Sequence, residues 1–239
     1  DVFQFSAGLN RVGLKAVNAL SSSFVATSHR EGKFKRAAFE NGALVAETDG
    51  ASDQVNGTEV TFHPGAQYFG EFRFDESLIR RRLLSYAYLN TGLSLHFGEE
   101  RFHSKNGLLD LLDDKVDGER LYDIVYFRGE QLEFAFCHSP GFGESYYSFV
   151  NGQYTNDGGT HQSAFREGVL KGVNEFAGKT MNGNDVRNGI VGAVAIKLKS
   201  PIFESQTKNK LGNTDIRAEL VGRIKDAVCT HLHKRPEVA

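Results

Sequence analysis

The chain has 239 residues, of which 40% are hydrophobic and 24% are charged. This composition is typical of a soluble globular protein of one or two domains, and a chain of this length can bury a large core. The formal net charge of -2 excludes a broadly basic nucleic-acid coat, so any contact with DNA would have to be local.

Cysteine usage and hydropathy indicate the compartment. The two cysteines, Cys137 and Cys229, are too few for a disulfide framework, and we expect them to be reduced and buried in a cytoplasmic protein. The sequence has no apolar run of about 18 residues and no signal-peptide pattern, so we expect neither a membrane contact nor secretion. It begins at Asp1 without a Met, and its first motif follows at once, so we expect a piece of a longer protein.

A glycine-bearing loop opens the chain. We predict a short strand at residues 2–5 and a helix at residues 14–21. The loop between them is Ser6-Ala7-Gly8-Leu9-Asn10-Arg11-Val12-Gly13. A loop of this kind at a helix N-terminus presents backbone N–H groups that can bind phosphate, although a plain tight turn is the alternative. It is not a Walker A loop, because Leu14 stands where that motif needs a Lys.

Residues 23–62 predict an antiparallel meander. Strands are expected at residues 23–28, 33–39 and 58–62. The turn signals are Arg30-Glu31-Gly32, Asn41-Gly42 and Asn56-Gly57. Alternating side chains in the last of these strands predict one buried and one exposed face.

Residues 75–89 have the apolar spacing of a helix. The run Arg80-Arg81-Arg82 within it is a possible nucleic-acid contact. An ordinary solvated face is favoured, however, because adjacent positions point in different directions around a helix.

Polar turn residues at 105–107 separate two sets of predicted helices and strands, each sufficient for a domain of its own. This predicts a domain boundary. We place one domain at residues 1–106 and the other at residues 107–239. The smaller elements expected on either side of the boundary are a strand at 94–97, a helix at 108–112, a hairpin of strands at 122–127 and 131–138, and a strand at 146–150. In the hairpin, alternation puts Leu132, Phe134 and Phe136 on one face.

The second domain is predicted to contain two long amphipathic helices. The first follows Asp157-Gly158-Gly159-Thr160-His161, with Thr160 as its N-cap and Gly178 as its C-terminal stop. Its apolar face consists of Phe165, Val169, Val173 and Phe176. The apolar face of the second consists of Ile216, Leu220, Ile224 and Val228. Between them we expect a polar turn at 185–188 and a buried strand at 190–198.

A polar loop follows that buried strand. Its sequence is Phe203-Glu204-Ser205-Gln206-Thr207-Lys208-Asn209-Lys210-Leu211-Gly212. The loop places an amide, a hydroxyl and two ammonium groups close together at the end of a strand, which favours presentation of donors to an anion. The alternative is an ordinary solvated loop, because Lys and Gln are mostly exposed in any protein.

Two further groups of residues have chemical potential but are set aside. Cys229, His231 and His233 are spaced by two, which puts their side chains on different faces of a helix, so we predict no metal site. Asp157 and His161 could form an acid/base pair. A loop-stabilising role is favoured, with the carboxylate accepting backbone N–H groups around the two glycines.

Three separated motifs together resemble one family. Residues 8–13, followed by Ala16-Val17-Asn18-Ala19-Leu20-Ser21, resemble the ATP-lid glycine motif of type IIA topoisomerase ATPase subunits. Residues 157–161 resemble the transducer signature of these subunits, and residues 203–212 resemble their Gln-Thr-Lys loop. Order and separation fit over essentially the whole chain. Residues 148–153 and 161–167 are more similar to the topoisomerase IV B subunit than to gyrase B.

The resemblance implies an α+β fold. It consists of the C-terminal part of a GHKL (Bergerat-type) α/β sandwich, followed by a transducer domain with a left-handed βαβ crossover. It also implies that the parent is an ATP-hydrolysing DNA topoisomerase, which dimerises and closes a gate on a DNA segment that is passed through a cleaved duplex. The implied cofactors are ATP and Mg in the parent. The implied partners are DNA, a topoisomerase A subunit and a second B subunit.

The resemblance also assigns roles to residues. The backbone of the lid would wrap the triphosphate through Gly8, Leu9, Asn10, Arg11, Val12 and Gly13. Thr58 would lie near the adenine. Gln206 and Lys208 would reach the γ-phosphate as the catalytic donors, and no residue is assigned to a metal.

Three departures from the family pattern limit these assignments. B subunits commonly have Gly where Arg11 stands, so the lid geometry is not implied. Gyrase B subunits can carry a basic residue where this chain has Asn156, so a DNA-facing charge is not expected there. The Glu that activates water and the residues that hold Mg and adenine would lie upstream of Asp1. We therefore expect this chain alone neither to hydrolyse ATP nor to bind it tightly.

Two alternatives remain open. The first is a non-catalytic dimerisation or DNA-interaction module descended from such a subunit. The second is another GHKL ATPase with a similar second domain, against which the signature at residues 157–161 argues.

Overall fold

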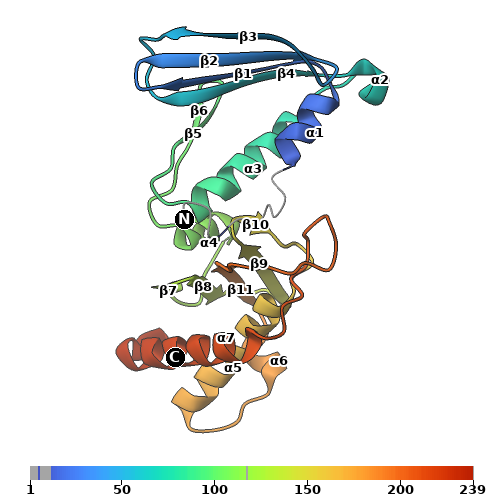
Figure 1. Ribbon diagram of the computed structural model, residues 1–239. Helices are drawn as coiled ribbons and strands as arrows, with labels where there is room; N and C mark the ends of the chain where they lie inside the picture. The colour runs from blue at the N-terminus through green and yellow to red at the C-terminus, as the bar shows by residue number, and fades with distance from the viewer. Residues whose placement is uncertain (1–4, 6–11, 117, 239) are drawn as a thin grey trace. The chain divides into compact units, whose positions relative to one another are not determined.

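The computed structural model of the chain describes residue 5, residues 12–116 and residues 118–238. The chain forms two compact units: the described residues of the first are 12–75, and those of the second are residue 5, residues 76–116 and residues 118–238. Figure 1 labels the elements of both units. Residues 76–106 belong to the second unit, and the predicted division into domains 1–106 and 107–239 stays a prediction.

The first unit is a sheet with two short helices. Its elements are α1 (Gly13–Ala19), β1 (Ser21–Arg30), β2 (Lys33–Glu40), β3 (Ala43–Ala51), β4 (Gly57–Pro64) and α2 (Ala66–Phe69). All neighbouring strands are antiparallel, in the order β3-β2-β1-β4. Two hairpin turns have positive φ at both central positions, with 53° and 74° at Glu31 and Gly32 and 48° and 81° at Asn41 and Gly42. This is the turn chemistry that the sequence predicts.

Strand β3 is the one element of the sheet that the sequence does not predict. Every residue from Ala43 to Ala51 is exposed. A strand that buries neither face has no reason to alternate apolar and polar side chains, so the period-two signal is missing. The strand exists because its backbone pairs with β2.

Aromatic side chains hold much of the first unit together. Phe24 is buried and meets Phe39 edge-on, with ring centroids 6.0 Å apart. A second group lies beside α1, where Phe62, Phe69, Phe72 and Phe74 line a cavity of about 240 Å³. Edge-to-face pairs such as Phe72 and Phe74, at 4.8 Å, contribute beyond the area that they bury.

The second unit is an α+β domain built on a five-stranded sheet. Its elements are α3 (Glu76–Leu89), β5 (Leu95–Phe97), β6 (Glu100–Phe102), α4 (Leu108–Lys115), β7 (Val125–Gly129), β8 (Leu132–His138), β9 (Glu144–Val150), β10 (Gln153–Tyr154), α5 (Thr160–Ala177), α6 (Gly183–Arg187), β11 (Ile190–Ile196), α7 (Arg217–Lys234) and a 3-10 turn (Pro236–Val238). The strand order is β10-β9-β11-β8-β7. Strands β9 and β11 are parallel and neighbouring, so β9, α5 and β11 form a βαβ unit.

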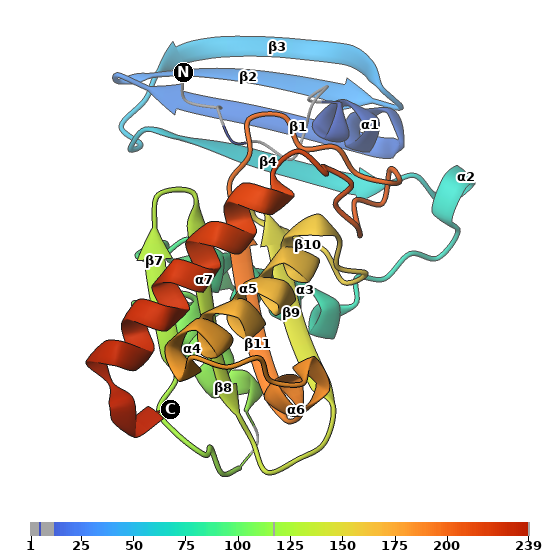
Figure 2. The ribbon, with the colours of Figure 1, turned by 90° about the horizontal axis from the view of Figure 1, so that it is seen from below.

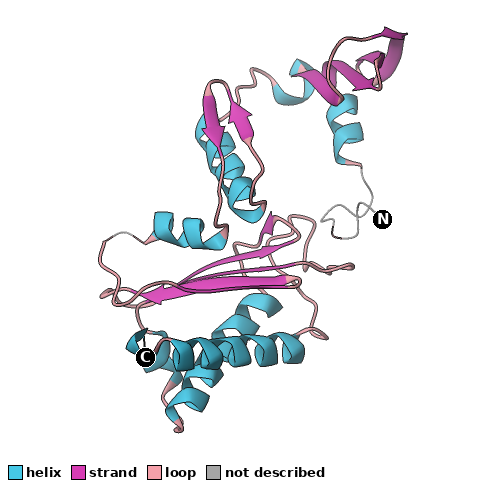
Figure 3. Ribbon diagram, turned by 90° about the vertical axis from the view of Figure 1, so that its left-hand side faces the viewer, coloured by secondary structure: helices cyan, strands magenta, loops and turns pink. Residues whose placement is uncertain are grey.

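Helices cover both faces of this sheet. Helices α5 and α7 lie side by side over one face (Figure 2), and α4 lies on the opposite face (Figure 3). Strand β8 contributes side chains to both faces of the sheet. Leu132, Phe134 and Phe136 pack toward α5 and α7, whereas Ala135 and Cys137 pack toward α4. The predicted shared face of the hairpin is therefore confirmed. The apolar faces predicted for the two long helices lie in the same core.

Two glycines allow α5 and α7 to pack closely. A Cβ added at Gly168 would lie 2.7 Å from the Ile224 side chain, and one at Gly172 would lie 2.7 Å from the Val228 side chain. Neither helix could keep its position with a larger residue at these two sites. The two helices thus pack together over the core that contains Phe165.

Several sequence expectations need correction. The helix predicted at 14–21 ends at Ala19, because Ser21 already begins β1. Of the predicted strand at 2–5, only Phe5 is described, and it lies in a turn. The polar turn predicted at 185–188 is mostly helix α6, which Asn182 caps by accepting the Asn184 N–H at 2.9 Å.

The start of α5 also differs from the prediction. Gly159, not Thr160, occupies the N-cap position, and Thr160 is the first helical residue. The predicted stop at Gly178 is confirmed, since this residue has φ 63° and its N–H caps the helix.

The two cysteines are free and buried, as predicted. Burial raises the pKa of the Cys137 thiol, which makes it a poor nucleophile. Across the described part of the chain, every helix is too short or too polar to cross a bilayer.

Candidate functional site

The Gln-Thr-Lys loop (residues 203–212) joins β11 to α7 and is the orange-red loop of Figure 1. Its two legs pair with each other. Phe203 and Leu211 form an antiparallel bridge, and the Glu204 N–H donates to the carbonyl oxygen of Lys210 at 3.0 Å. The loop is therefore a closed hairpin, and only the residues between these legs form its tip.

The tip carries both of the predicted phosphate-contacting side chains. The Lys208 N–H donates to the Ser205 carbonyl at 3.1 Å, which closes a turn, and the Ser205 and Thr207 hydroxyls lie 2.6 Å apart. Gln206 is exposed and Lys208 is half-buried. Lys208 has φ 58°, in the left-handed region that side-chain-bearing residues seldom occupy. Gln206 and Lys208 thus belong to one tight, ordered turn.

The second lysine of the loop has a carboxylate partner. Lys210 forms an ion pair with Glu204, with Nζ 3.0 Å from Oε1 and both side chains about half exposed. Such an exposed pair contributes at most about 1 kcal/mol, but it neutralises both charges locally. Lys208 lies at the tip, where the sequence predicts a contact with an anion.

Two asparagines fix the ends of the loop. The Asn151 amide accepts from the Leu198 N–H and donates to the Leu198 carbonyl, both at 2.7 Å. The Asn213 carbonyl oxygen accepts from the Ile202 N–H at 2.6 Å, and Asn213 is buried. Sequence reasoning missed both residues. For Asn151 the only signal was a turn dipeptide, and for Asn213 there was none.

The segment of residues 157–161 packs directly on the second leg of the loop. Gly159 and Leu211 form a parallel bridge, in which the Leu211 N–H donates to the Gly158 carbonyl at 3.2 Å and the Thr160 N–H donates to the Leu211 carbonyl at 3.1 Å. Two residues before this bridge in each segment, the Asp157 N–H donates to the Asn209 carbonyl at 3.0 Å. Two of the motifs found in the sequence are therefore one structural unit.

The carboxylate of Asp157 does not play the predicted role. In the part of the chain that the structure describes, this carboxylate accepts a hydrogen bond from the Asn156 side-chain amide at 3.4 Å. It accepts none from the N–H groups of Gly158 and Gly159. The backbone of Asp157 provides the stabilising bond instead. His161 is fully buried, so it cannot act with Asp157 as an accessible acid/base pair. Burial lowers the pKa of His161 to about 3.

Thr58 and the described end of the predicted lid, Val12 and Gly13, lie in the first unit. Gly8, Leu9, Asn10 and Arg11 are outside the described residues, so their part of the prediction is not tested. Val12 is the N-cap of α1 and Gly13 its first residue, and both are exposed. Thr58 lies on β4 opposite Ser28 of β1 and is also exposed. The split phosphate site that the sequence predicts would need both units and stays a prediction.

The remaining candidates do not assemble into a site. Within residues 12–116 and 118–238, no three His, Cys, Asp or Glu side chains gather closely enough to hold a metal ion. Arg80 is bound by Glu76 at 3.0 Å and by Glu100 at 2.8 Å. Arg81 and Arg82 line a cavity of about 540 Å³ beside α4 and β10, so the three arginines do not form a single patch.

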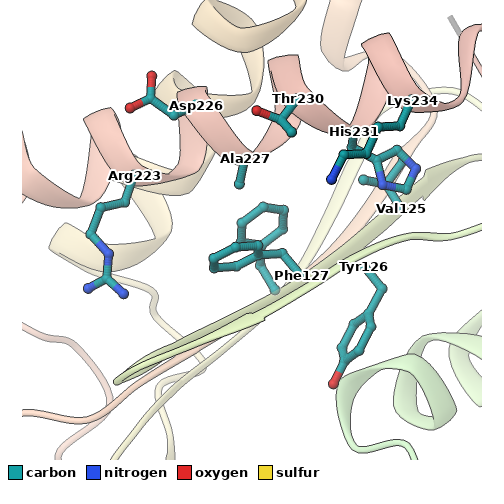
Figure 4. Close-up of a pocket in the computed structure, with 10 residues that line it drawn as sticks. Val125, Tyr126, Phe127, Arg223, Asp226, Ala227, Thr230, His231 and Lys234 are labelled. Carbon is teal, nitrogen blue, oxygen red and sulfur yellow. The ribbon is translucent and has the colours of Figure 1, made fainter.

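A groove of about 490 Å³ lies between β7 and α7. Figure 4 shows Arg223 at one end and His231 and Lys234 at the other, with Phe127 between them. Arg223 is already engaged, because it donates to the Glu130 carbonyl at 2.5 Å and lies 3.7 Å from Glu219. The groove has no convergent set of donors comparable to the Gln-Thr-Lys tip.

Comparisons with known sequences place the chain in one family. Residues 107–239 match the sequence profile of one family, DNA gyrase B. The B subunit of DNA topoisomerase 4 from Borreliella burgdorferi is 48% identical over 235 residues, which are 98% of this chain and 39% of that protein. The B subunit of DNA gyrase from Helicobacter pylori is 29% identical over 100% of this chain and 34% of that protein. The chain thus spans about two fifths or less of the length of these relatives.

Solved structures of gyrase B and topoisomerase IV domains also match the chain. The 43K ATPase domain of Thermus thermophilus gyrase B, solved with an aminocoumarin, matches with a TM-score of 0.81 and 31% identity, over 96% of this chain and 68% of that chain. The ATP-binding domain of Francisella tularensis topoisomerase IV matches with a TM-score of 0.73 and 26% identity, over 97% of this chain and 70% of that chain. The family profile covers more than half of the sequence. The chain belongs to the DNA gyrase B family.

Proposed function

We propose that this chain is part of the B subunit of an ATP-dependent type II DNA topoisomerase, a cytoplasmic enzyme that acts on DNA with an A subunit and a second B subunit. In this proposal, residues 1–106 are the distal part of the ATPase domain and residues 107–239 are the transducer. The observation that carries the proposal is the closed Gln-Thr-Lys loop, which holds Gln206 and Lys208 at its tip.

The donor set of the loop fits the terminal phosphate of a nucleotide. The tip from Ser205 to Lys208 carries an ammonium, an amide and two hydroxyls, and it contains no carboxylate. The one acidic residue at its base, Glu204, is neutralised by Lys210. A multiply charged phosphate at this turn could therefore bind several donors and would meet no carboxylate of the tip.

In the proposed reaction, Lys208 and Gln206 stabilise the terminal phosphate of ATP. The bound nucleotide supplies the phosphoryl group that is transferred to water. Lys208 compensates the charge that moves during transfer, and Gln206 donates an N–H to the same group. In this proposal the backbone of residues 8–13 would hold the other phosphates, and Thr58 would lie near the adenine. No side chain of the described residues is assigned to the magnesium ion that accompanies ATP.

The same contacts explain how a nucleotide moves a domain. A ligand shifts an equilibrium only through its different affinity for the two states. Lys208 and Gln206 contact the terminal phosphate of ATP, which ADP lacks, so the transducer gains a contact only while ATP is bound. The transducer would close the gate on DNA in that state.

The test uses the complete subunit, expressed from its full gene and combined with its A subunit. Lys208→Ala is expected to lower ATP turnover more than about 100-fold, because one preorganised donor is lost. Lys210→Ala is the matched control. It removes a lysine two positions away whose charge is already paired, and it should keep turnover close to wild type.

Near-normal turnover of Lys208→Ala would refute the assigned role of the loop. The topoisomerase assignment is tested separately by ATP-dependent strand passage on supercoiled and catenated DNA. A complete protein that binds DNA but passes no strand with ATP would contradict that assignment.

A further inference from the structure

The segment of residues 157–161 has no role in the proposed function so far, yet its backbone is bound directly to the Gln-Thr-Lys loop. Three backbone hydrogen bonds join them. They run from Asp157 to Asn209, from Leu211 to Gly158 and from Thr160 to Leu211, at 3.0, 3.2 and 3.1 Å. Asn209 directly follows Lys208 in the sequence. The backbone on the C-terminal side of Lys208 is therefore fixed by this segment.

Only glycine permits this approach. A Cβ at Gly159 would lie 2.4 Å from the carbonyl oxygen and 2.5 Å from the nitrogen of Leu211, closer than real contacts allow. Gly159 also has φ 124°, and Gly158 has φ 72°, both in the region that side chains disfavour. Any side chain at position 159 would push the second leg of the loop away.

A buried polar network holds the segment from the other side. The His161 Nε2 lies 2.9 Å from the Thr155 hydroxyl, and that hydroxyl lies 2.8 Å from the Ser148 carbonyl. The Ser148 hydroxyl in turn lies 3.0 Å from Gln162 Oε1. Ser148, Thr155 and His161 are all buried, so water does not compete for these bonds.

The Thr155 hydroxyl is the hydrogen-bond partner of His161 in this network. It also lies 2.8 Å from the carbonyl oxygen of Ser148 and 2.8 Å from the Ser148 hydroxyl. The other ring nitrogen of His161, Nδ1, is buried and has no hydrogen-bond partner among the described residues. The Thr155 hydroxyl is thus the polar contact that orients the ring at the start of α5.

The geometry points to a positioning element for the nucleotide-sensing tip. We infer that Gly159, with the Thr155–His161 pair behind it, sets the position from which Lys208 and Gln206 reach the terminal phosphate. The inference rests on the proposed function of the Gln-Thr-Lys loop. None of the three positioning residues touches the nucleotide. They act through the backbone of Leu211 and Asn209.

The test compares the affinities of the complete subunit for a non-hydrolysable ATP analogue and for ADP. Thr155→Val keeps the shape of the side chain but removes the hydroxyl that His161 needs. It is expected to lower the preference for the analogue over ADP by roughly tenfold or more, because small displacements of a positioned donor are costly. ADP affinity should stay at the wild-type value, because ADP has no terminal phosphate for the tip to contact. Thr155→Ser, which restores the hydroxyl, should recover the preference.

Gly159→Ala is the second variant and is expected to lose the same preference by the direct route through Leu211. Gly222→Ala on α7 is the control, because an added Cβ there meets no atom within 4 Å. A role limited to folding would lower stability and both affinities together, and this result would overturn the inference. An unchanged preference in Thr155→Val would also overturn it.

Lys208→Ala in the same assay distinguishes the sensing role of the loop from the positioning role of Gly159, Thr155 and His161. Loss of the preference in Lys208→Ala without loss in Thr155→Val or Gly159→Ala would reject the positioning element alone. An unchanged preference in Lys208→Ala itself would reject the sensing role of the loop, and the positioning role would fail with it.

Discussion

Gly159 and Leu211 lie in backbone contact, so close that the Cα of Gly159 has no room for a side chain. This contact joins the N-terminus of α5 to the second leg of the Gln-Thr-Lys loop. The Thr160 hydroxyl, 3.4 Å from the Leu211 carbonyl, lies at the same junction, between residues 51 positions apart in the sequence. A displacement of the loop at this point therefore acts directly on the first turn of α5.

The contact predicts a large stability cost for Gly159→Ala in the 239-residue chain. The cost of the positive φ angle and the cost of the collision with Leu211 are additive. We therefore expect a loss of roughly 3 kcal/mol in the free energy of unfolding. Gly178→Ala separates the two effects, since Gly178 has φ 63° but an added Cβ meets nothing within 4 Å. That variant should lose only about 1–2 kcal/mol. Urea unfolding measures both, and equal losses would contradict the collision.

The packing of α5 on α7 predicts opposite effects for the same substitution at two sites. Gly168→Ala places a methyl group 2.7 Å from Ile224, and overpacking of this kind costs about 1–3 kcal/mol. Gly222→Ala in α7 meets open space and gains the helix propensity of Ala, up to about 1 kcal/mol. Thermal unfolding should therefore move to lower temperature in the first variant and to higher temperature in the second. A stabilised Gly168→Ala would show that the two helices can move apart without cost.

Local chemistry explains which parts of the structure the sequence predicts. The turn at Asn41-Gly42 and the stop at Gly178 depend on residues that accept positive φ, and the apolar stripes of α5 and α7 depend on spacing along one helix. These signals need no knowledge of distant residues. Family resemblance adds the order of the motifs and the α+β fold, and the fold agrees with the matching solved structure.

The parts that the sequence does not predict depend on partners far along the chain. Gly159 displaces Thr160 from the N-cap position because its backbone is bound to Leu211. Strand β3 forms by pairing with β2 although it buries no side chain. Asn213 looks like any polar loop residue until its amide is seen to bind the Ile202 N–H. Each of these is a tertiary contact without a local pattern.

The buried His161 predicts how stability depends on pH. Its pKa of about 3 in the folded chain lies below the ordinary value of 6.5, and the cause is burial. Folding therefore favours the neutral ring. The stability from this group is fully present above pH 6.5, and it declines as pH falls toward 3, by up to about 1.4 kcal/mol for each pH unit. Burial also lowers the pKa of His138, which adds a decline in the same direction.

The His161→Gln variant isolates this contribution. It should be less stable than wild type at pH 7, but its stability should fall less steeply between pH 6.5 and pH 4.5. Carboxylates titrate in both proteins, so they cancel in the difference between the two curves. His96→Gln, at an exposed position on β5, controls for the loss of one histidine. Parallel curves for His161→Gln and wild type would show that His161 is not held neutral.

Asn213 predicts how firmly the base of the Gln-Thr-Lys loop is held. Its carbonyl oxygen accepts the Ile202 N–H at 2.6 Å, and its N–H group lies 3.4 Å from both the Ser200 carbonyl and an Asp215 carboxylate oxygen. Asn213→Ala removes the acceptor of the Ile202 N–H, and loss of such a hydrogen bond costs about 0.5–1.5 kcal/mol. We expect faster hydrogen exchange at Ile202 and at Glu204, because the first leg of the loop loses its anchor while the second leg stays bound to Gly158. Asn209→Ala serves as the control, since Asn209 meets the 157–161 segment through its backbone carbonyl, which the substitution keeps. Exchange that is unchanged in Asn213→Ala would mean that the pairing of the two legs alone closes the loop.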